Sequence, residues 1–306
     1  MKKLVVSVTN KCNFHCRHCL REYGNTPDLD ISLMKKILPD LKKMGYSHIG
    51  ITGGEPILYP KIDEFLKLIT SGGLSFNIVS NGLLWNRYIP LVRKYRQNLT
   101  HMTFSLDAHN AEINDNIRQE GSFQKVMEAV NNIKMEDVPV VISTCLNKEN
   151  KSFIKEMMSL MEKIKPAHIN FNGIIETSSN KSIVLSQNER NECLSKINQL
   201  ASDYNVKIRA TSSLQTPRII PFCEELNLTS MMLNPQGELC FCCNTIREGA
   251  ILGSIKTDSF IDLYLKGLDI ANSIRKERAK IIHKNEFPDN FCNCNFCSDF
   301  LDKYIK

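Results

Sequence analysis

The chain has 306 residues, of which 42% are hydrophobic and 24% are charged. This composition supports a sizeable core and excludes an intrinsically disordered chain. The formal net charge of +6 is mild and the basic residues are dispersed, which disfavours nucleic acid as a partner. No run approaches about 18 apolar residues, and the apolar run near the N-terminus is too short for a signal peptide. We therefore expect a cytoplasmic protein that does not enter a membrane.

The first part of the chain alternates short β-type runs with amphipathic helical patterns. The predicted strands are Leu4–Thr9, His48–Thr52, Ser75–Ser80, Met102–Leu106, Val140–Thr144 and His168–Asn172. The predicted helices are Ser32–Met44, Ile62–Ser71, Trp85–Lys94, Ser122–Ile133 and Ser152–Ile164. Such alternation implies parallel strands joined by right-handed crossovers. The sequence therefore predicts an α/β fold built on a partial (β/α)6 TIM-like barrel.

Polar residues accumulate where these predicted strands end. They are Cys12, Gly53-Gly54-Glu55, Ser80-Asn81, Ser105, Asp107, Ser143–Asn147 and Asn172. In β/α barrels the carboxyl ends of the strands form the mouth that holds the active site. We expect one mouth to gather all of these groups.

The alternation stops after about residue 205. A predicted helix over Gln187–Ala201 is followed by short β-like runs at Lys207–Ala210 and Ser230–Leu233, a turn at 234–237 and a helix over Phe260–Arg275. The end of the chain is rich in cysteine. We predict a barrel domain over residues 1–200 and a small α+β, metal-dependent domain over residues 201–306.

The chain contains 12 cysteines, and their positions are uneven. Three cluster near the N-terminus and seven crowd the C-terminal third, whereas only Cys145 and Cys193 lie between. Thiols of a cytosolic protein bind metal or act in catalysis more often than they form disulfides. This distribution predicts two metal sites, and we expect Cys145 and Cys193 to be small core or surface residues.

Cys12, Cys16 and Cys19 follow the first predicted strand with the spacing C-x3-C-x2-C. Three thiolates on one loop can hold three irons of a [4Fe–4S] cluster and leave the fourth iron open to a small molecule. A zinc site is the alternative, with His15 or His18 as the fourth ligand.

The second predicted strand closes on Thr52-Gly53-Gly54-Glu55-Pro56, where two glycines permit close backbone approach to a ligand and the carboxylate can bind an ammonium group. Together with the cysteine triad, this segment resembles the radical SAM superfamily. Ser105-Leu106-Asp107 is similar to a strand end of that family, and Arg118 followed by Gly121-Ser122-Phe123 resembles its peptide-modifying subgroup. His18 departs from the family, since an aromatic residue usually stands there.

The resemblance implies a role for each of these residues. The three cysteines would bind a [4Fe–4S] cluster, and Gly53, Gly54 and Glu55 would meet the amino group of S-adenosylmethionine (SAM). Ser105 and Arg118 would contact the SAM ribose and carboxylate, with Ser80 and Asn81 near the nucleoside. The reduced cluster would then cleave SAM to a 5′-deoxyadenosyl radical that removes hydrogen from an unactivated C–H bond. An electron donor such as flavodoxin or ferredoxin is implied.

The C-terminal cysteines show a second spacing pattern. It comprises Cys223, Gly237 and Cys242, then Cys294-x2-Cys297. This resembles the twitch domain, a short relative of the SPASM domain, which binds one auxiliary [4Fe–4S] cluster, so the four cysteines are the expected ligands. Cys240 and Cys292 are alternative ligands, and a zinc-binding domain is the alternative reading.

Cys243 adjoins the predicted ligand Cys242. In radical SAM peptide epimerases and an aminoglycoside epimerase, a thiol near the auxiliary cluster donates hydrogen to the substrate radical. We therefore predict Cys243 as the hydrogen donor of a radical epimerase that acts on a ribosomally synthesised peptide. The absence of a fused peptide-recognition segment before the first strand weakens the peptide reading.

Two further functions compete with this one. The auxiliary cluster would instead oxidise the substrate radical in a dehydrogenase or a crosslinking enzyme, and the substrate would be a carbohydrate or aminoglycoside instead of a peptide. The positive net charge disfavours a polycationic aminoglycoside. A non-catalytic metal-binding protein is the third hypothesis, which the polar strand ends disfavour.

Overall fold

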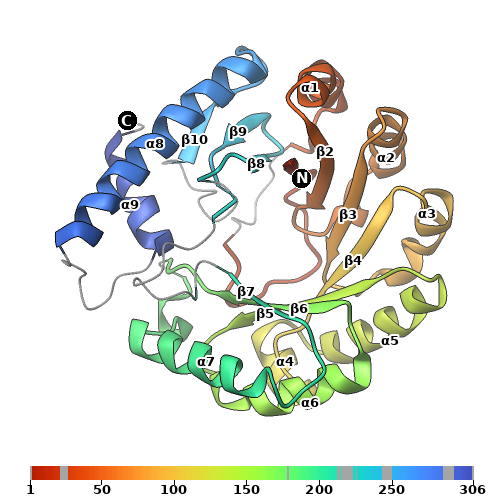
Figure 1. Ribbon diagram of the computed structural model, residues 1–306. Coiled ribbons are helices and arrows are strands. Elements are labelled where there is room, and N and C mark those ends of the chain that lie inside the picture. Colours follow the sequence, from red (N-terminus) through yellow and green to blue (C-terminus); the bar gives the residue numbers. More distant parts are fainter. Residues whose placement is uncertain are drawn as a thin grey trace.

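Figure 1 shows the computed structural model of the protein, in which helices surround a curved sheet. The structure describes residues 2–20, 27–177, 179–211, 214, 223–224, 226–242, 250–284 and 293–304. Its strands are β1 (Lys2–Ser7), β2 (Tyr46–Thr52), β3 (Ser75–Ser80), β4 (Leu99–Ser105), β5 (Val140–Leu146), β6 (His168–Gly173), β7 (Ile208–Ala210), β8 (Ser230–Leu233), β9 (Glu238–Cys240) and β10 (Ile251–Ser254). Its α-helices are α1 (Ile31–Lys43), α2 (Ile62–Ser71), α3 (Ile89–Lys94), α4 (Ala111–Ile117), α5 (Ser122–Met135), α6 (Ile154–Ile164), α7 (Gln187–Leu200), α8 (Phe260–Lys284) and α9 (Asn293–Tyr304).

All of these strands belong to one sheet with the order β10-β9-β8-β1-β2-β3-β4-β5-β6-β7. Each pairing from β8 through β1 to β7 is parallel, whereas β9 and β10 are antiparallel additions at one edge. The predicted α/β fold with a partial barrel is therefore confirmed. None of the described helices is both long and apolar enough to cross a membrane.

The first helix illustrates why the predicted pattern forms this structure. The Asp30 carboxylate accepts a hydrogen bond from the Ser32 backbone N–H at 2.9 Å and so caps the helix N-terminus. Ile31, Met34 and Leu41 lie on one helical face and are buried. Burial of that face against the sheet is what stabilises the helix.

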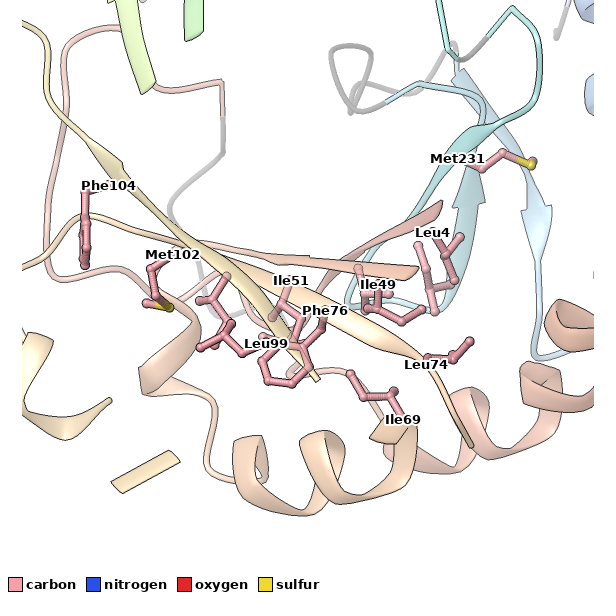
Figure 2. Close-up of a cluster of buried hydrophobic side chains, with 14 of the residues drawn as sticks. Leu4, Ile49, Ile51, Ile69, Leu74, Phe76, Leu99, Met102, Phe104 and Met231 are labelled. Carbon is pink, nitrogen blue, oxygen red and sulfur yellow. The ribbon is translucent and has the colours of Figure 1, made fainter. Parts of the chain in front are cut away.

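The main core lies between the outer face of the sheet and the helices. Figure 2 shows Ile49, Ile51 and Phe76 of the strands on the side of the sheet that faces Ile69 of α2, with Leu4 beside Ile49. All five side chains are at most 1% exposed. Each such side chain stabilises the fold by about 1.5–3 kcal/mol relative to an exposed one. Because successive residues of a strand point to opposite faces, the residues between these apolar ones point toward the inside of the barrel.

Several element boundaries differ from the predicted ones. The helix predicted over Trp85–Lys94 is a 3-10 turn at Trp85–Arg87 followed by α3, since Pro90 favours a new helix start. Helix α8 runs nine residues beyond the predicted end, to Lys284 instead of Arg275. Helices α4 and α9 were not predicted.

The chain after residue 200 contributes strands to both sides of the parallel sheet. β7 pairs with β6, and Lys3 of β1 aligns with Ser230 of β8. One sheet therefore runs through both predicted domains, because the short runs at 208–210 and 230–233 pair in parallel with barrel strands. The division at residue 200 stays a prediction.

Candidate functional site

The three cysteines of the predicted triad lie on the loop that follows β1, here called the cysteine loop (residues 12–19). All three thiols are half-buried. The Cys19 backbone N–H donates to the Cys16 carbonyl at 3.0 Å, and the Phe14 N–H donates to Cys12 Sγ at 3.4 Å. The loop is thus folded tightly, with one sulfur already accepting a backbone hydrogen bond.

The Gly53-Gly54-Glu55 segment packs directly on the chain that enters the cysteine loop. The Gly54 N–H donates to the Thr9 carbonyl at 2.7 Å, and the Glu55 N–H donates to the Lys11 carbonyl at 2.8 Å. A Cβ on Gly54 would lie 2.1 Å from the Lys11 oxygen, and one on Gly53, whose φ is +156°, would lie 2.6 Å from the Thr9 oxygen. The close approach that the glycines allow in the structure is therefore to backbone, which positions the cysteine loop.

Glu55 is fully buried and its carboxylate is surrounded by donors. Ser80 Oγ donates at 3.0 Å, the Asn81 N–H donates at 2.8 Å, and the Tyr88 hydroxyl donates as well. Burial raises the pKa of Glu55, although these hydrogen bonds oppose the shift. The side chain therefore ties the ends of β2 and β3 together, and its contact with an ammonium group stays a prediction.

Asn81 connects that carboxylate to the cysteine loop. Its Nδ2 donates to Asn13 Oδ1 at 2.7 Å and lies 3.9 Å from Cys12 Sγ. Ser80 and Asn81 thus sit beside the cysteines, at the predicted mouth. Ser105, the last residue of β4, is half-buried and aligns with Ser143 of β5.

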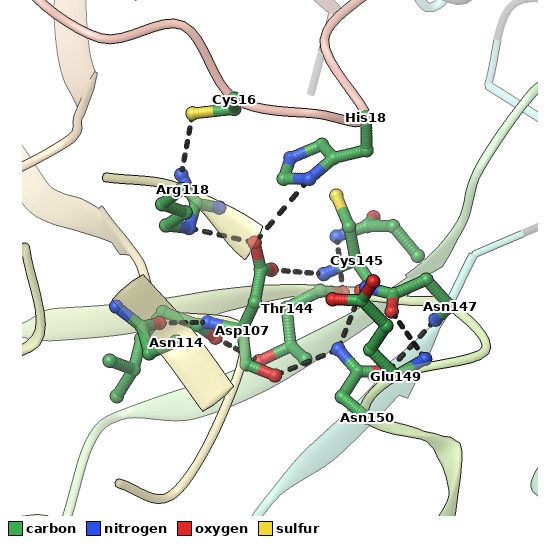
Figure 3. A network of polar contacts seen from close by, with 12 residues as sticks. Cys16, His18, Asp107, Asn114, Arg118, Thr144, Cys145, Asn147, Glu149 and Asn150 are labelled. Atoms are coloured by element: carbon green, nitrogen blue, oxygen red, sulfur yellow. Dashed lines mark hydrogen bonds and ion pairs between the residues drawn. The ribbon is translucent and has the colours of Figure 1, made fainter. Parts of the chain in front are cut away.

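A second buried network joins the cysteine loop to the ends of β4 and β5, as Figure 3 shows. Arg118 Nε lies 2.7 Å from Asp107 Oδ2, and the two side chains are 6% and 0% exposed. The Nε–H is not aimed at that oxygen, so the contact is an ion pair and not a hydrogen bond. Arg118 Nη1 also donates to Cys16 Sγ at 3.9 Å, and Asp107 Oδ1 accepts from the Cys145 N–H at 2.7 Å.

The segment after β4 holds Arg118 in place through local hydrogen bonds. The Asp107 N–H donates to Asn114 Oδ1 at 2.9 Å, and Asn114 Nδ2 donates to Ser122 Oγ at 2.8 Å. The carboxylate of Asp115 accepts from the Phe123 N–H at 2.8 Å. Asn114, whose carbonyl also accepts from the Arg118 backbone N–H at 2.9 Å, therefore links the Gly-Ser-Phe segment at the start of α5 to both Asp107 and Arg118.

His18, Asp107 and Cys145 offer three ligand atoms that all lie within 4.8 Å of one another. Burial lowers the pKa of His18 to about 4, although Asp107 opposes the shift, so this imidazole is neutral at pH 7. The Arg118 guanidinium already pairs with Asp107 and repels a cation placed there. We therefore interpret this set as part of the Asp107–Arg118 network and not as a metal site.

The sequence analysis placed residues 143–147 at the mouth but gave Cys145 no role in the site, because it was expected to be a small core or surface residue. On β5 its side chain shares a face with Ser143, and Asn172 is its register partner on β6. Burial raises the pKa of its thiol. The period of two along the strand was the available signal, because it puts the side chains of Cys145 and the polar Ser143 on the same face.

The predicted auxiliary ligands Cys223, Cys242, Cys294 and Cys297 are all described and half-buried. Cys240 is fully buried on β9. Cys243, the predicted hydrogen donor, and Cys292 lie outside the described residues. The auxiliary ligand set therefore stays a prediction.

The cysteine loop fits an iron–sulfur cluster by its donor set. It presents three thiols on one short loop, and N–H groups of Phe14, Asn81 and Arg118 reach the sulfurs of Cys12 and Cys16. N–H donors to sulfur stabilise thiolates that carry the negative charge of a bound cluster. Cys12, Cys16 and Cys19 are the residues that would hold it.

Curated proteins of known function match part of the chain. A GTP 3′,8-cyclase of Chlorobaculum tepidum is 31% identical over 132 residues, which cover 42% of this chain and 39% of that protein. The mycofactocin maturase MftC of Mycobacterium tuberculosis is 30% identical over 162 residues, which cover 51% of this chain and 41% of that protein. The chain thus spans about two fifths of the length of these relatives.

Solved structures share the fold at low sequence identity. SuiB of Streptococcus suis bound to S-adenosylmethionine superimposes with a TM-score of 0.69 at 15% identity, covering 86% of this chain and 65% of that one. Native anSMEcpe with bound AdoMet gives a TM-score of 0.70 at 13% identity, covering 99% of this chain and 96% of that one.

The family model of the radical SAM superfamily matches residues 6–161, just over half of the chain. This range contains the cysteine loop, the Gly-Gly-Glu segment and the Asp107–Arg118 pair, which the structure brings to one mouth. The chain therefore belongs to the radical SAM superfamily.

Proposed function

We propose that this radical SAM enzyme modifies a ribosomally synthesised peptide and that the outcome is epimerisation of one residue. Hydrogen would be removed from a substrate C–H bond and returned to the opposite face by a thiol, for which Cys243 is the expected donor. SAM and the cluster, when bound, supply the 5′-deoxyadenosyl radical that abstracts the hydrogen. The protein positions the substrate and excludes other hydrogen donors.

The observation that carries the proposal is the packing of the Gly-Gly-Glu segment against residues 9–11, which lead directly into the cysteine loop. Two backbone hydrogen bonds, from Gly54 to Thr9 and from Glu55 to Lys11, join the two segments. Arg118 and Asn81 reach the same loop from the ends of other strands. Cluster ligands and SAM-binding candidates thus face one another, which is what a cofactor bound to the open iron requires.

The peptide class is supported by proteins of similar sequence or fold. MftC is a maturase of mycofactocin, and the solved SuiB structures include one bound to its precursor peptide SuiA. Because thiol S–H bonds are weaker than C–H bonds, hydrogen transfer from a thiol to a substrate carbon radical is downhill. The thiyl radical would then take one electron and one proton to restore the thiol.

We further propose that Cys223, Cys242, Cys294 and Cys297 bind an auxiliary [4Fe–4S] cluster and that flavodoxin or ferredoxin supplies electrons. All four thiols are half-buried. Cys223, Cys242 and Cys297 pack against the edge of the main core. Two clusters correspond to about eight irons per chain.

Anaerobic reconstitution tests the cofactor part. We expect about eight irons per chain and reductive cleavage of SAM to 5′-deoxyadenosine. Cys12→Ala should abolish SAM cleavage, whereas Cys193→Ala, on α7 away from the mouth, should retain it. Zinc in place of iron, or no SAM cleavage by the loaded protein, would refute the proposal.

Deuterated water tests the outcome. An epimerase places one deuteron from the donor thiol in the product, whereas a dehydrogenase or a crosslinking enzyme places none. Cys243→Ala should still form 5′-deoxyadenosine but no epimerised product. Full epimerisation by this variant would exclude Cys243 as the donor, and turnover of a carbohydrate but of no peptide would exclude the peptide class.

A further inference from the structure

The Arg118 guanidinium lies between a cysteine of the cysteine loop and a buried carboxylate, as Figure 3 shows. Its Nη1 is 3.9 Å from Cys16 Sγ, and its Nε is 2.7 Å from Asp107 Oδ2. We propose that Arg118 donates an N–H···S hydrogen bond to Cys16 when this cysteine ligates the cluster. Asp107 anchors Arg118, and the pair sets the reduction potential of that cluster. The inference rests on the proposed function only for the presence of a cluster on the cysteine loop.

Asn114 and Asp107 hold Arg118 in position. Its backbone N–H donates to the Asn114 carbonyl at 2.9 Å, and its side chain is 6% exposed. Asp107 is fixed in turn by the Cys145 N–H on Oδ1 and by the bond from its own N–H to Asn114 Oδ1. Separating a buried guanidinium from its carboxylate would leave two uncompensated charges away from water, which is strongly unfavourable. The Arg118–Asp107 pair therefore stays together.

The electrostatic effect at the cluster follows from these positions. Reduction adds one electron to the cluster, and a guanidinium next to a ligand sulfur stabilises the added negative charge. A hydrogen bond to that sulfur acts in the same direction and raises the reduction potential. Asp107 has the opposite effect, but Arg118 lies between this carboxylate and the Cys16 sulfur, so the nearer positive charge has the larger influence.

Two single variants therefore have opposite expected signs. Arg118→Met removes the positive charge and the N–H donor, which should lower the reduction potential. Asp107→Asn removes the negative charge while Arg118 remains, which should raise it. A role in folding alone would not move the potential in opposite directions.

The measurement is a redox titration of the reconstituted protein followed by electron paramagnetic resonance, without substrate. The signal that changes when SAM is added belongs to the cluster of the cysteine loop, which separates it from any auxiliary cluster. Arg118→Lys, which retains the charge, should lie between wild type and Arg118→Met. Arg93→Met is the matched control, because Arg93 is exposed and pairs with Glu136 on the outer side. It should leave the potential unchanged.

Asp107→Asn leaves Arg118 buried without its ion pair and can lower stability severely. The double variant Arg118→Met/Asp107→Asn removes both charges and should shift the potential less than Arg118→Met alone. Equal potentials for wild type, Arg118→Met and Arg118→Lys would overturn the inference, as would a shift in the same direction for both single substitutions. If no cluster assembles in wild type, the proposed function fails first, and iron and sulfide analysis shows this before any titration.

Discussion

Substitution of Gly54 by alanine tests how the cysteine loop is positioned. An added Cβ would lie 2.1 Å from the Lys11 carbonyl oxygen and 2.7 Å from that of Asn10. Both neighbours are backbone atoms that cannot rotate away. The Gly-Gly-Glu segment must therefore shift away from residues 9–11. The hydrogen bonds from the Gly54 and Glu55 N–H groups to the Thr9 and Lys11 carbonyls must then lengthen or break.

The expected cost follows from these contacts. Two backbone hydrogen bonds contribute about 0.5–1.5 kcal/mol each, and overpacking adds about 1–3 kcal/mol. Gly54→Ala should therefore lower the free energy of unfolding by about 2–6 kcal/mol. At about 2–4 °C per kcal/mol, the melting temperature should fall by about 4 °C or more. The displaced cysteine loop should also bind less iron on reconstitution.

Gly50→Ala is the matched control, because Gly50 lies on β2, the strand that leads into the Gly-Gly-Glu segment. A Cβ there would meet its nearest atom, Asn77 Oδ1, at 3.5 Å, which is ordinary van der Waals contact. This variant should unfold within about 1 °C of wild type or slightly above it, since glycine in a strand is the less stable residue. The assay is thermal unfolding by circular dichroism, with iron counted after reconstitution. Equal melting temperatures and equal iron for the two variants would refute the reasoning.

The remaining predictions concern Tyr88 and the pH dependence of stability. Tyr88→Phe removes a donor to the buried Glu55 carboxylate and the acceptor of the Ile57 N–H, which should lower the free energy of unfolding by about 2–4 kcal/mol in urea titrations. Tyr59→Phe removes one hydroxyl donor to the Leu29 carbonyl and should cost only about 1 kcal/mol; an equal cost for both would contradict this ranking. Burial and the neighbouring His168 lower the pKa of His101 from 6.5 to about 4, so the folded state resists protonation. The contribution of His101 to the free energy of unfolding should be fully present above pH 6.5 and fall as the pH drops toward 4. His101→Asn should reduce the slope of the free energy of unfolding against pH in this range. An unchanged slope would contradict the prediction.

Much of the barrel could be predicted from local patterns. The strands around residues 48–52 and 75–80 were predicted because hydrophobic residues alternate along them, and the helix around residues 62–71 because they recur at helical spacing. The C-x3-C-x2-C spacing and the Gly-Gly-Glu-Pro segment identified the family. Both motifs consist of residues that are close together in the chain, so they can be recognised without knowledge of the fold. The position of polar residues at strand ends indicated a common mouth before any contact was known.

Contacts between distant segments were decided only by the tertiary structure. The parallel pairing of β8 with β1 joins residues more than 200 positions apart, and no local period encodes it. The burial of Glu55 among Ser80, Asn81 and Tyr88 follows from the packing of three separate segments. In contrast, the sequence by itself determined that Arg118 and Cys16 belong to family motifs. Their contact exists because the fold brings the segment after β4 to the cysteine loop, where a buried charge must find a partner.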